Sequence, residues 1–354
     1  SGRVSATEDA ALRRGGDESP PRLQQIAAAA GVSQATVSRV LNNKAGVAEA
    51  TRRSVLTAVD VLGYERPASL RRAGAGAIGL VVPELDNPIF PALAQAVTTR
   101  LAAAGYTAVL CPTSAGGVQE DEYLSMLLER GIAGLIHVSG RHADTTASIA
   151  RHQELVAQGL PVVLVNGHRD DLAVTSLSTD DRVAVRLAVS HLLSLGHRRL
   201  GLAVGPARYT PSIRKLTAFR DAAAEFGFEA LVEHTWFSVE GGELAGTQLT
   251  ARGASGIICG SDLMALGVIR GARHAGLDVP RELSVVGFDG SAMTEHTSPP
   301  LTTVRQNVPA LADGAVDTLL DQIRGLAAAA PCARELVLAP DLVVRASTGP
   351  PPVR

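Results

Sequence analysis

From residue 77 onward, short apolar runs alternate with longer amphipathic stretches, and this rhythm limits the fold of the 354-residue chain more than any other feature. Alternation of this kind predicts parallel sheets whose strands are joined by right-handed helical crossovers. The expected strands are 78–82, 108–111, 134–138, 162–166, 199–204, 256–259 and 284–288. The expected helices between them are 89–104, 119–130, 183–195, 213–225 and 263–275.

The rhythm breaks near residues 177–180 and then restarts, which predicts two similar lobes in an α/β core with two doubly wound parallel sheets. A late segment, 301–306, and a helix at 309–324 are expected to return to the first lobe. We therefore assign the core to 77–346 and a tail to 347–354. The first lobe is expected to hold 77–176 and 304–326, and the second 178–300 and 331–346. Ligands of such folds bind beyond the carboxyl ends of the strands, in the cleft between the lobes.

The residues before the core read as a helix-turn-helix. The stretch 23–30 is a strong helix former, and Gly31 suits a left-handed helix end. Ser33 then stands where a second helix, 34–41, needs an N-cap. A third helix is expected at about 48–62. The outer face of the second helix offers Gln34, Ala35 and Arg39, side chains that suit the base edges of a major groove.

The charge distribution agrees with a polyanionic partner, although the total of −2 seems to argue against one. Residues 20–76 carry a net charge of +5, whereas residues 77–354 carry −6. A basic module on an acidic body is typical of nucleic-acid binding, and an ordinary solvated basic face is the alternative.

The run 26–42, IAAAAGVSQATVSRVLN, closely resembles the headpiece of the lactose-repressor (LacI/GalR) family of bacterial transcription regulators. Core segments such as 283–289, LSVVGFD, and 300–306, PLTTVRQ, extend the resemblance over nearly 22–346. It implies a core like that of periplasmic sugar-binding proteins and a repressor that binds a pseudo-palindromic double-stranded DNA operator. By resemblance, the residues that contact or orient DNA are Ser33, Gln34, Ala35, Thr36, Ser38, Arg39, Asn42, Thr51 and Leu70. Arg22 stands where the family usually has Thr, and we expect it to contact a phosphate instead.

The segment between headpiece and core departs from the family pattern. We expect a disordered tail at 1–19, a headpiece at 20–63 and a hinge at 64–76 that is shorter than usual. Leu70 would be the apolar wedge that enters the minor groove. The short hinge leaves an alternative open, a small-molecule binding protein whose operator function is weakened or lost. The family's tetramers use an additional C-terminal helix, and this chain ends in prolines, so we expect a homodimer.

The resemblance also implies a binding site for a small-molecule effector that controls operator affinity. Its residues would be Ile89, Phe90, His137, Asn166, Lys215, Phe237, Ser261, Asp289 and Gln306. Carboxylates and amides suit hydroxyl groups, and an aromatic ring suits an apolar face, so a sugar-like polar ligand is expected. Lys215 stands where the family usually has Arg. The alternative for Phe90 and Phe237 is that they belong to the hydrophobic core. Asp262 is expected to be a helix N-cap.

Several other classes of protein are disfavoured by the sequence. No nucleophile elbow, Walker loop or metal-spaced His pair is present, so we expect no enzyme, no catalytic residue, no metal and no cofactor. The glycines of 74–79 match a dinucleotide fingerprint but precede a strand rather than a helix. The polar N-terminus, the three scattered cysteines and the lack of a spanning apolar run predict a cytoplasmic protein without a membrane partner.

Overall fold

The computed structural model describes residues 23–41, 46–62, 75–113, 118–326 and 333–352. They form two compact units, one within 1–73 and one within 74–354, and each is described by itself. Among the described residues, no helix is both long and apolar enough to cross a membrane.

The N-terminal unit is a three-helix headpiece made of α1 (Leu23–Ala30), α2 (Gln34–Leu41) and α3 (Glu49–Val61). Ile26, Val37 and Val55 are fully buried and hold the three helices together. Gly31 has φ +65°, the left-handed conformation that ends α1. The Ser33 Oγ accepts a hydrogen bond from the Thr36 amide at 3.2 Å, so Ser33 is the N-cap of α2, as predicted.

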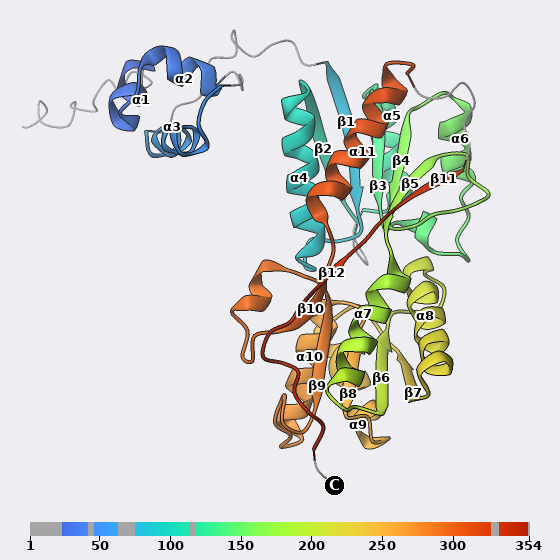
Figure 1. The fold of residues 1–354 in the computed structure, drawn as a ribbon. Coiled ribbons are helices and arrows are strands. Elements are labelled where there is room, and N and C mark those ends of the chain that lie inside the picture. Colours follow the sequence, from blue (N-terminus) through green and yellow to red (C-terminus); the bar gives the residue numbers. More distant parts are fainter. Residues whose placement is uncertain (1–22, 42–45, 63–74, 114–117, 327–332, 353–354) are drawn as a thin grey trace, which may run out of the picture. The chain divides into compact units, whose positions relative to one another are not determined.

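The first lobe of the core is a six-stranded sheet in the order β11-β5-β4-β3-β1-β2, with helices on both faces (Figure 1). Its elements are β1 (Gly76–Val82), α4 (Ile89–Ala103), β2 (Tyr106–Pro112), α5 (Glu120–Glu129), β3 (Gly134–Val138), α6 (Ala150–Ala157), β4 (Val162–Val165), β5 (Thr175–Thr179), α11 (Val308–Ile323) and β11 (Arg334–Leu338). Helices α4 and α11 cover one face, and α5 and α6 cover the other. A one-turn 3₁₀ helix, Arg141–Ala143, follows β3.

The second lobe repeats this plan in a sheet of order β12-β10-β9-β8-β6-β7. Its elements are α7 (Asp181–Ser194), β6 (Arg199–Val204), α8 (Thr210–Phe226), β7 (Glu229–His234), α9 (Val239–Ala251), β8 (Gly256–Cys259), α10 (Asp262–His274), β9 (Ser284–Asp289), a 3₁₀ turn (Ala292–Glu295), β10 (Thr302–Arg305) and β12 (Asp341–Val343). Helices α7 and α8 pack on one face, and α9 and α10 on the other. The α/β fold with two doubly wound sheets is therefore as predicted, except that β12 pairs antiparallel with β10.

The predicted lobe boundaries need three corrections. β5 ends at Thr179, so the first lobe extends beyond 176. β10 pairs with β9, which assigns residues up to 305 to the second lobe. β11 pairs with β5, although 331–346 was expected in the second lobe. The chain thus crosses between the lobes after β5, after β10 and after β11. As predicted, α11 lies in the first lobe and β12 in the second.

Four strands were not predicted from the sequence: β5, β7, β11 and β12. In addition, β1 begins at Gly76, inside the expected hinge. β5 reads Thr-Ser-Leu-Ser-Thr and has no apolar run, because its buried positions hold hydroxyl side chains. β7, β11 and β12 lie at sheet edges, where the strands are largely unburied and carry charged residues, so no continuous apolar run marks them.

The segment predicted as a tail, 347–354, is packed against the second lobe in its described part. Ser347 is fully buried. Its Oγ accepts from the Thr302 amide at 2.8 Å and donates to the Val285 carbonyl at 2.6 Å. The Gly349 amide donates to Ser284 Oγ at 3.0 Å. These hydrogen bonds attach the segment to β9 and β10, so it is part of the fold.

Replacing Ser347 with Ala leaves a buried amide and a buried carbonyl without their partner. We expect Ser347→Ala to lower the free energy of unfolding by about 1–3 kcal/mol, measured by urea denaturation. Ser194→Ala removes a hydroxyl that bonds a carbonyl on an exposed helix end and is the matched control. Equal stability of the two variants would contradict a structural role for this segment.

Candidate functional site

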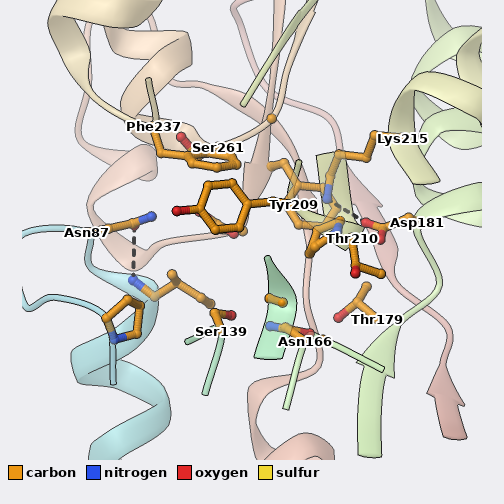
Figure 2. Close-up of a pocket in the computed structure, with 18 of the residues that line it drawn as sticks. Asn87, Ser139, Asn166, Thr179, Asp181, Tyr209, Thr210, Lys215, Phe237 and Ser261 are labelled. Atoms are coloured by element: carbon orange, nitrogen blue, oxygen red, sulfur yellow. Dashed lines mark hydrogen bonds and ion pairs between the residues drawn. The ribbon is translucent and has the colours of Figure 1, made fainter. Parts of the chain in front are cut away.

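The carboxyl ends of the parallel strands in both sheets converge on one pocket of about 420 Å³ (Figure 2). From the first lobe it is lined by residues that end or follow β1, β3, β4 and β5, including Pro83, Ser139, Asn166 and Thr179. From the second lobe the corresponding residues follow β6, β8, β9 and β10, among them Pro206, Ser261, Asp289 and Gln306. The size falls within the usual range for small-molecule sites.

Backbone strain is concentrated at this pocket. In the described part of the chain, only Ser139 (φ 46°), Asn166 (φ 58°) and Asp289 (φ 117°) are non-glycine residues with positive φ, and all three line the pocket. Each stands at the carboxyl end of a strand. Non-glycine residues rarely adopt this conformation, and where they do, they cluster at ligand-binding and catalytic sites. The strain therefore singles out the pocket independently of its shape.

An aromatic wall forms one side of the pocket. The Tyr209 and Phe237 rings lie with centroids 6.4 Å apart at an interplanar angle of 62°, and Figure 2 shows the two rings next to each other. A Cβ at Gly205 would lie 2.0 Å from the Phe237 ring, so only glycine there lets the ring take this position. Phe90 contributes from the start of α4. Such faces suit the C–H groups of a sugar ring.

The pocket contains a buried ion pair at its other side. Lys215 Nζ lies 2.5 Å from Asp181 Oδ1, and both side chains are 7% exposed. The ammonium also lies 3.8 Å from the centroid of the Phe288 ring. Burial raises the pKa of Asp181 and the Lys215 charge opposes that rise. The Lys215 ammonium is therefore a fixed hydrogen-bond donor at the pocket. Its positive charge is already compensated by Asp181.

Asp289 and Gln306 bridge the two lobes beneath the ligand space. Gln306 Nε2 donates to Asp289 Oδ1 at 2.8 Å, and Gln306 Oε1 accepts from Thr179 Oγ1 at 2.8 Å. Asp289 Oδ2 is buried without a hydrogen-bond partner. Burial and the nearby Asp262 carboxylate raise the pKa of Asp289 well above its ordinary value. A ligand hydroxyl that donates to Oδ2 would satisfy this oxygen.

The capping of α10 differs from the prediction. Ser261, not Asp262, is the N-cap, because its Oγ accepts from the Met264 amide at 3.2 Å. Asp262 instead accepts from the Ser291 amide at 2.7 Å and from Thr303 Oγ1 at 2.6 Å. Burial outweighs these hydrogen bonds and raises the pKa of Asp262 to about 6. Asp262 thereby holds the loop after β9 against β10.

Direct contacts join the lobes at the rim of the pocket. Arg208 Nε lies 2.9 Å from Asp144 Oδ2, and the Thr145 amide donates to the Arg208 carbonyl at 2.9 Å. Arg214 forms a two-pronged pair with Glu335 of β11 at 2.6 and 3.0 Å. Arg214 is therefore committed to the lobe contact, which leaves Lys215 as the cation inside the pocket.

His137 is the one predicted effector residue that the structure removes from the pocket. Its side chain is fully buried behind the wall, where Nδ1 lies 2.8 Å from His152 Nε2. In a strand, neighbouring side chains point to opposite faces, and His137 points under α6 rather than toward the cleft. Burial, then the neighbouring His137, lower the pKa of His152 to about 4. Burial by itself would raise the pKa of Glu120. The neighbouring His137 and the hydrogen bond from the Arg141 amide outweigh burial and lower this pKa to about 2.

The other eight predicted effector residues all line the pocket: Ile89, Phe90, Asn166, Lys215, Phe237, Ser261, Asp289 and Gln306. The pocket is also lined by four residues that were not predicted from the sequence: Asp181, Tyr209, Thr179 and Ser139. Ser139 follows a correctly predicted strand and was within reach of the rule that ligands lie at strand ends. Asp181 and Thr179 flank the unpredicted end of β5, and no sequence signal marked them.

The headpiece presents the predicted DNA-reading residues on its surface. Gln34, Ala35 and Arg39 of α2 are exposed, as is Ser33. Thr36, Ser38 and Thr51 are half-buried, which suits residues that orient the backbone of a nucleic acid. The remaining three predicted contacts, Arg22, Asn42 and Leu70, and the tail 1–19 lie outside the described residues.

A helix-turn-helix headpiece and a two-lobed core with an interlobe pocket define a DNA-binding protein that carries a small-molecule receptor. Residues 22–67 match the family of bacterial regulatory proteins called lacI, and residues 189–348 match the periplasmic binding protein-like domain. The HTH-type transcriptional regulator MalR of Streptomyces coelicolor is 53% identical over 338 residues, which are 94% of this chain and 97% of the relative. DegA of Bacillus subtilis, an HTH-type transcriptional regulator, is 32% identical over 93% of this chain and 98% of its own length.

Solved structures agree. A complex of the transcriptional regulator CelR with cellobiose has a TM-score of 0.69 and 29% identity, and covers 92% of this chain and 99% of its own. A lac repressor dimer bound to operator and the anti-inducer ONPF has a TM-score of 0.67 and 26% identity, and covers 94% and 100%. The chain therefore belongs to the lacI family of DNA-binding transcriptional regulators, which are not enzymes.

The buried ion pair makes a stability prediction. Lys215→Met leaves Asp181 buried and uncompensated, and we expect it to cost about 3–5 kcal/mol in the free energy of unfolding. The double variant Lys215→Met/Asp181→Asn removes both charges and should recover most of that loss. Urea denaturation of the two variants at one pH measures the difference. A double variant as unstable as the single one would mean that Asp181 is not the partner that matters.

Proposed function

We propose that this chain is a repressor whose affinity for a pseudo-palindromic operator is controlled by a small, sugar-like effector in the interlobe pocket. The observation that carries the proposal is the set of strained polar residues and aromatic rings that close on one cavity. The CelR structure holds cellobiose, and a lacI-family regulator of Enterococcus faecium, at a TM-score of 0.68 and 28% identity, holds ribose. Their ligands support a sugar at this site.

The pocket chemistry favours a neutral polyol over a carboxylate. The pocket lysine is already paired with Asp181, and Arg214 with Glu335. Asp289 offers a buried carboxyl oxygen without a hydrogen-bond partner, which a ligand hydroxyl can satisfy. Hydroxyl groups can donate to Asp289 and Asn166 and accept from Lys215, while the rings of Tyr209 and Phe237 cover the C–H faces.

The effector acts, in this proposal, through the angle between the lobes. Pocket residues come from both lobes, and the Arg208–Asp144 and Arg214–Glu335 pairs span the same rim. A ligand that binds one lobe angle more tightly shifts the population toward it. The change reaches the operator if two chains pair through their cores and each headpiece takes one half-site, as the lac repressor dimer on its operator suggests. Because its target is chromosomal DNA, we assign the chain to the bacterial cytoplasm.

The operator contact generates a prediction for α2. We expect Arg39→Ala to weaken binding to a duplex selected in vitro by about 1–3 kcal/mol, because a guanidinium that reads a base is lost. Fluorescence anisotropy on the selected duplex measures specific binding, and on a scrambled duplex it measures non-specific binding. Arg220→Ala changes the charge equally on an exposed position of the core and is the control.

Weak binding that ignores sequence for every duplex at physiological salt would instead favour the alternative, a small-molecule binding protein that has lost its operator function.

The pocket generates a second prediction. A thermal-shift screen of the full chain with sugars, nucleosides and small acids should find stabilisation by a sugar. Phe237→Ala should weaken the binding of that sugar by about 1.5–3 kcal/mol, roughly ten- to a hundredfold in Kd, because a ring face is lost. Phe226→Ala, at the exposed end of α8, should leave the affinity unchanged. Stabilisation by acids alone would contradict a sugar-like effector.

A further inference from the structure

A cluster of four ionisable side chains lies buried behind the first-lobe wall of the pocket. His137 and His142 are fully buried, His152 is 1% exposed and Glu120 is 6% exposed. They come from four different elements: β3, the 3₁₀ helix Arg141–Ala143, α6 and the first residue of α5. Buried polar groups of this density need partners, and neither the effector pocket nor the headpiece uses them.

The three histidines are close enough to share one ion, and Glu120 lies beside two of them. One ring nitrogen from each histidine can be chosen so that all three lie within 4.8 Å of one another. His137 Nδ1 lies 2.8 Å from His152 Nε2, and Glu120 Oε1 lies 3.8 Å from His152 Nε2. The edge of a tetrahedron with bonds of about 2.0–2.1 Å is roughly 3.4 Å, so these distances bracket a zinc coordination shell.

The cluster is also short of hydrogen bonds. Neither ring nitrogen of His142 has a hydrogen-bond partner by distance and angle, although the Val165 carbonyl lies nearby. Glu120 Oε1 has no hydrogen-bond partner either, whereas His137 Nε2 lies 3.2 Å from Glu120 Oε2, within ion-pair distance. Buried polar atoms without a partner are costly, so the three in this cluster favour a ligand that binds them.

Two glycines make room for the cluster. A Cβ at Gly140 would lie 2.0 Å from His137 Nε2 and 2.7 Å from Glu120 Oε2. A Cβ at Gly167 would lie 2.5 Å from the His142 ring. Any other residue at either position would displace the imidazoles from their present arrangement.

We propose that His137, His142, His152 and Glu120 form a binding site for one divalent transition-metal ion, of which Zn²⁺ fits best. Three imidazoles and one carboxylate form a four-ligand nitrogen and oxygen set, which suits Zn²⁺ and disfavours Mg²⁺ and Ca²⁺, whose sites are built from oxygen. The ion would satisfy the His142 ring and Glu120 Oε1 together.

The site has a defined place in the regulator. His142 immediately precedes Ala143, which lines the pocket, and Asp144, which pairs with Arg208 across the lobes. Gly140 and Gly167 directly follow the strained pocket residues Ser139 and Asn166. A bound ion would therefore tie together the loop that carries the interlobe contact and the two strand ends that hold the pocket wall.

Metal content tests the proposal directly. The full chain, without a histidine tag, is purified from zinc-supplemented medium and analysed by mass spectrometry. We expect one Zn²⁺ per chain, removed by a strong chelator with a fall in the thermal midpoint and restored with it by added ZnCl₂. Less than a tenth of an ion per chain, together with a thermal midpoint that ignores both chelator and zinc, would overturn the proposal.

Variants and a spectroscopic probe separate this site from surface binding. Glu120→Gln keeps the shape of the side chain. It should lower the affinity for Zn²⁺ at least tenfold, measured by competition with a chromophoric chelator. His142→Ala should abolish binding, whereas His296→Ala, at an exposed position, should leave it unchanged. If His142→Ala fails to fold, Co²⁺ added to the chelated wild-type chain decides: an intense visible spectrum of tetrahedral cobalt supports the site, and the weak spectrum of octahedral cobalt overturns it.

Discussion

Parallel pairing is the constraint on which the rest of the core depends. In each sheet the parallel strands share one direction, so their carboxyl ends meet along one edge. Two such edges face each other across the cleft, and nearly every strand end contributes a pocket residue. Because the chain crosses between the lobes three times, a ligand that contacts both edges also acts on the segments that connect them.

Much of the fold was predictable because its signals are local. Apolar runs marked β3, β6 and β8 with their exact bounds, and turn chemistry marked the headpiece, where Gly31 and Ser33 end one helix and begin the next. The strands that were missed lack a local signal. β5 buries hydroxyls, and β11 becomes a strand only because β5 offers it an edge to pair with. Lobe membership is likewise a long-range property.

The residues of the candidate site divide in the same way, into those that the sequence predicted and those that only the folded chain brings together. The family resemblance predicted Asn166, Asp289, Phe237 and Lys215 alike. Asn166 and Asp289 also stand at strand ends, where ligands of this topology bind. Asp181 was not predicted, because its importance arises from a lysine 34 positions away along the chain. The histidine cluster is a sharper case: its members show no metal-ligand spacing in the sequence and meet only when four elements pack together. His137 was accordingly assigned to the pocket rather than to the layer behind it.

The proposed mechanism links pocket and operator through the lobe angle, and such linkage must be reciprocal. The most direct measurement is the Kd of the stabilising sugar, determined by calorimetry once on the free chain and once on the chain saturated with its operator duplex. Reciprocal coupling predicts that the two Kd values differ by about 5–150-fold, as is typical of allosteric proteins. Equal values on free and operator-bound protein would contradict it, because a ligand with the same affinity for both states shifts neither.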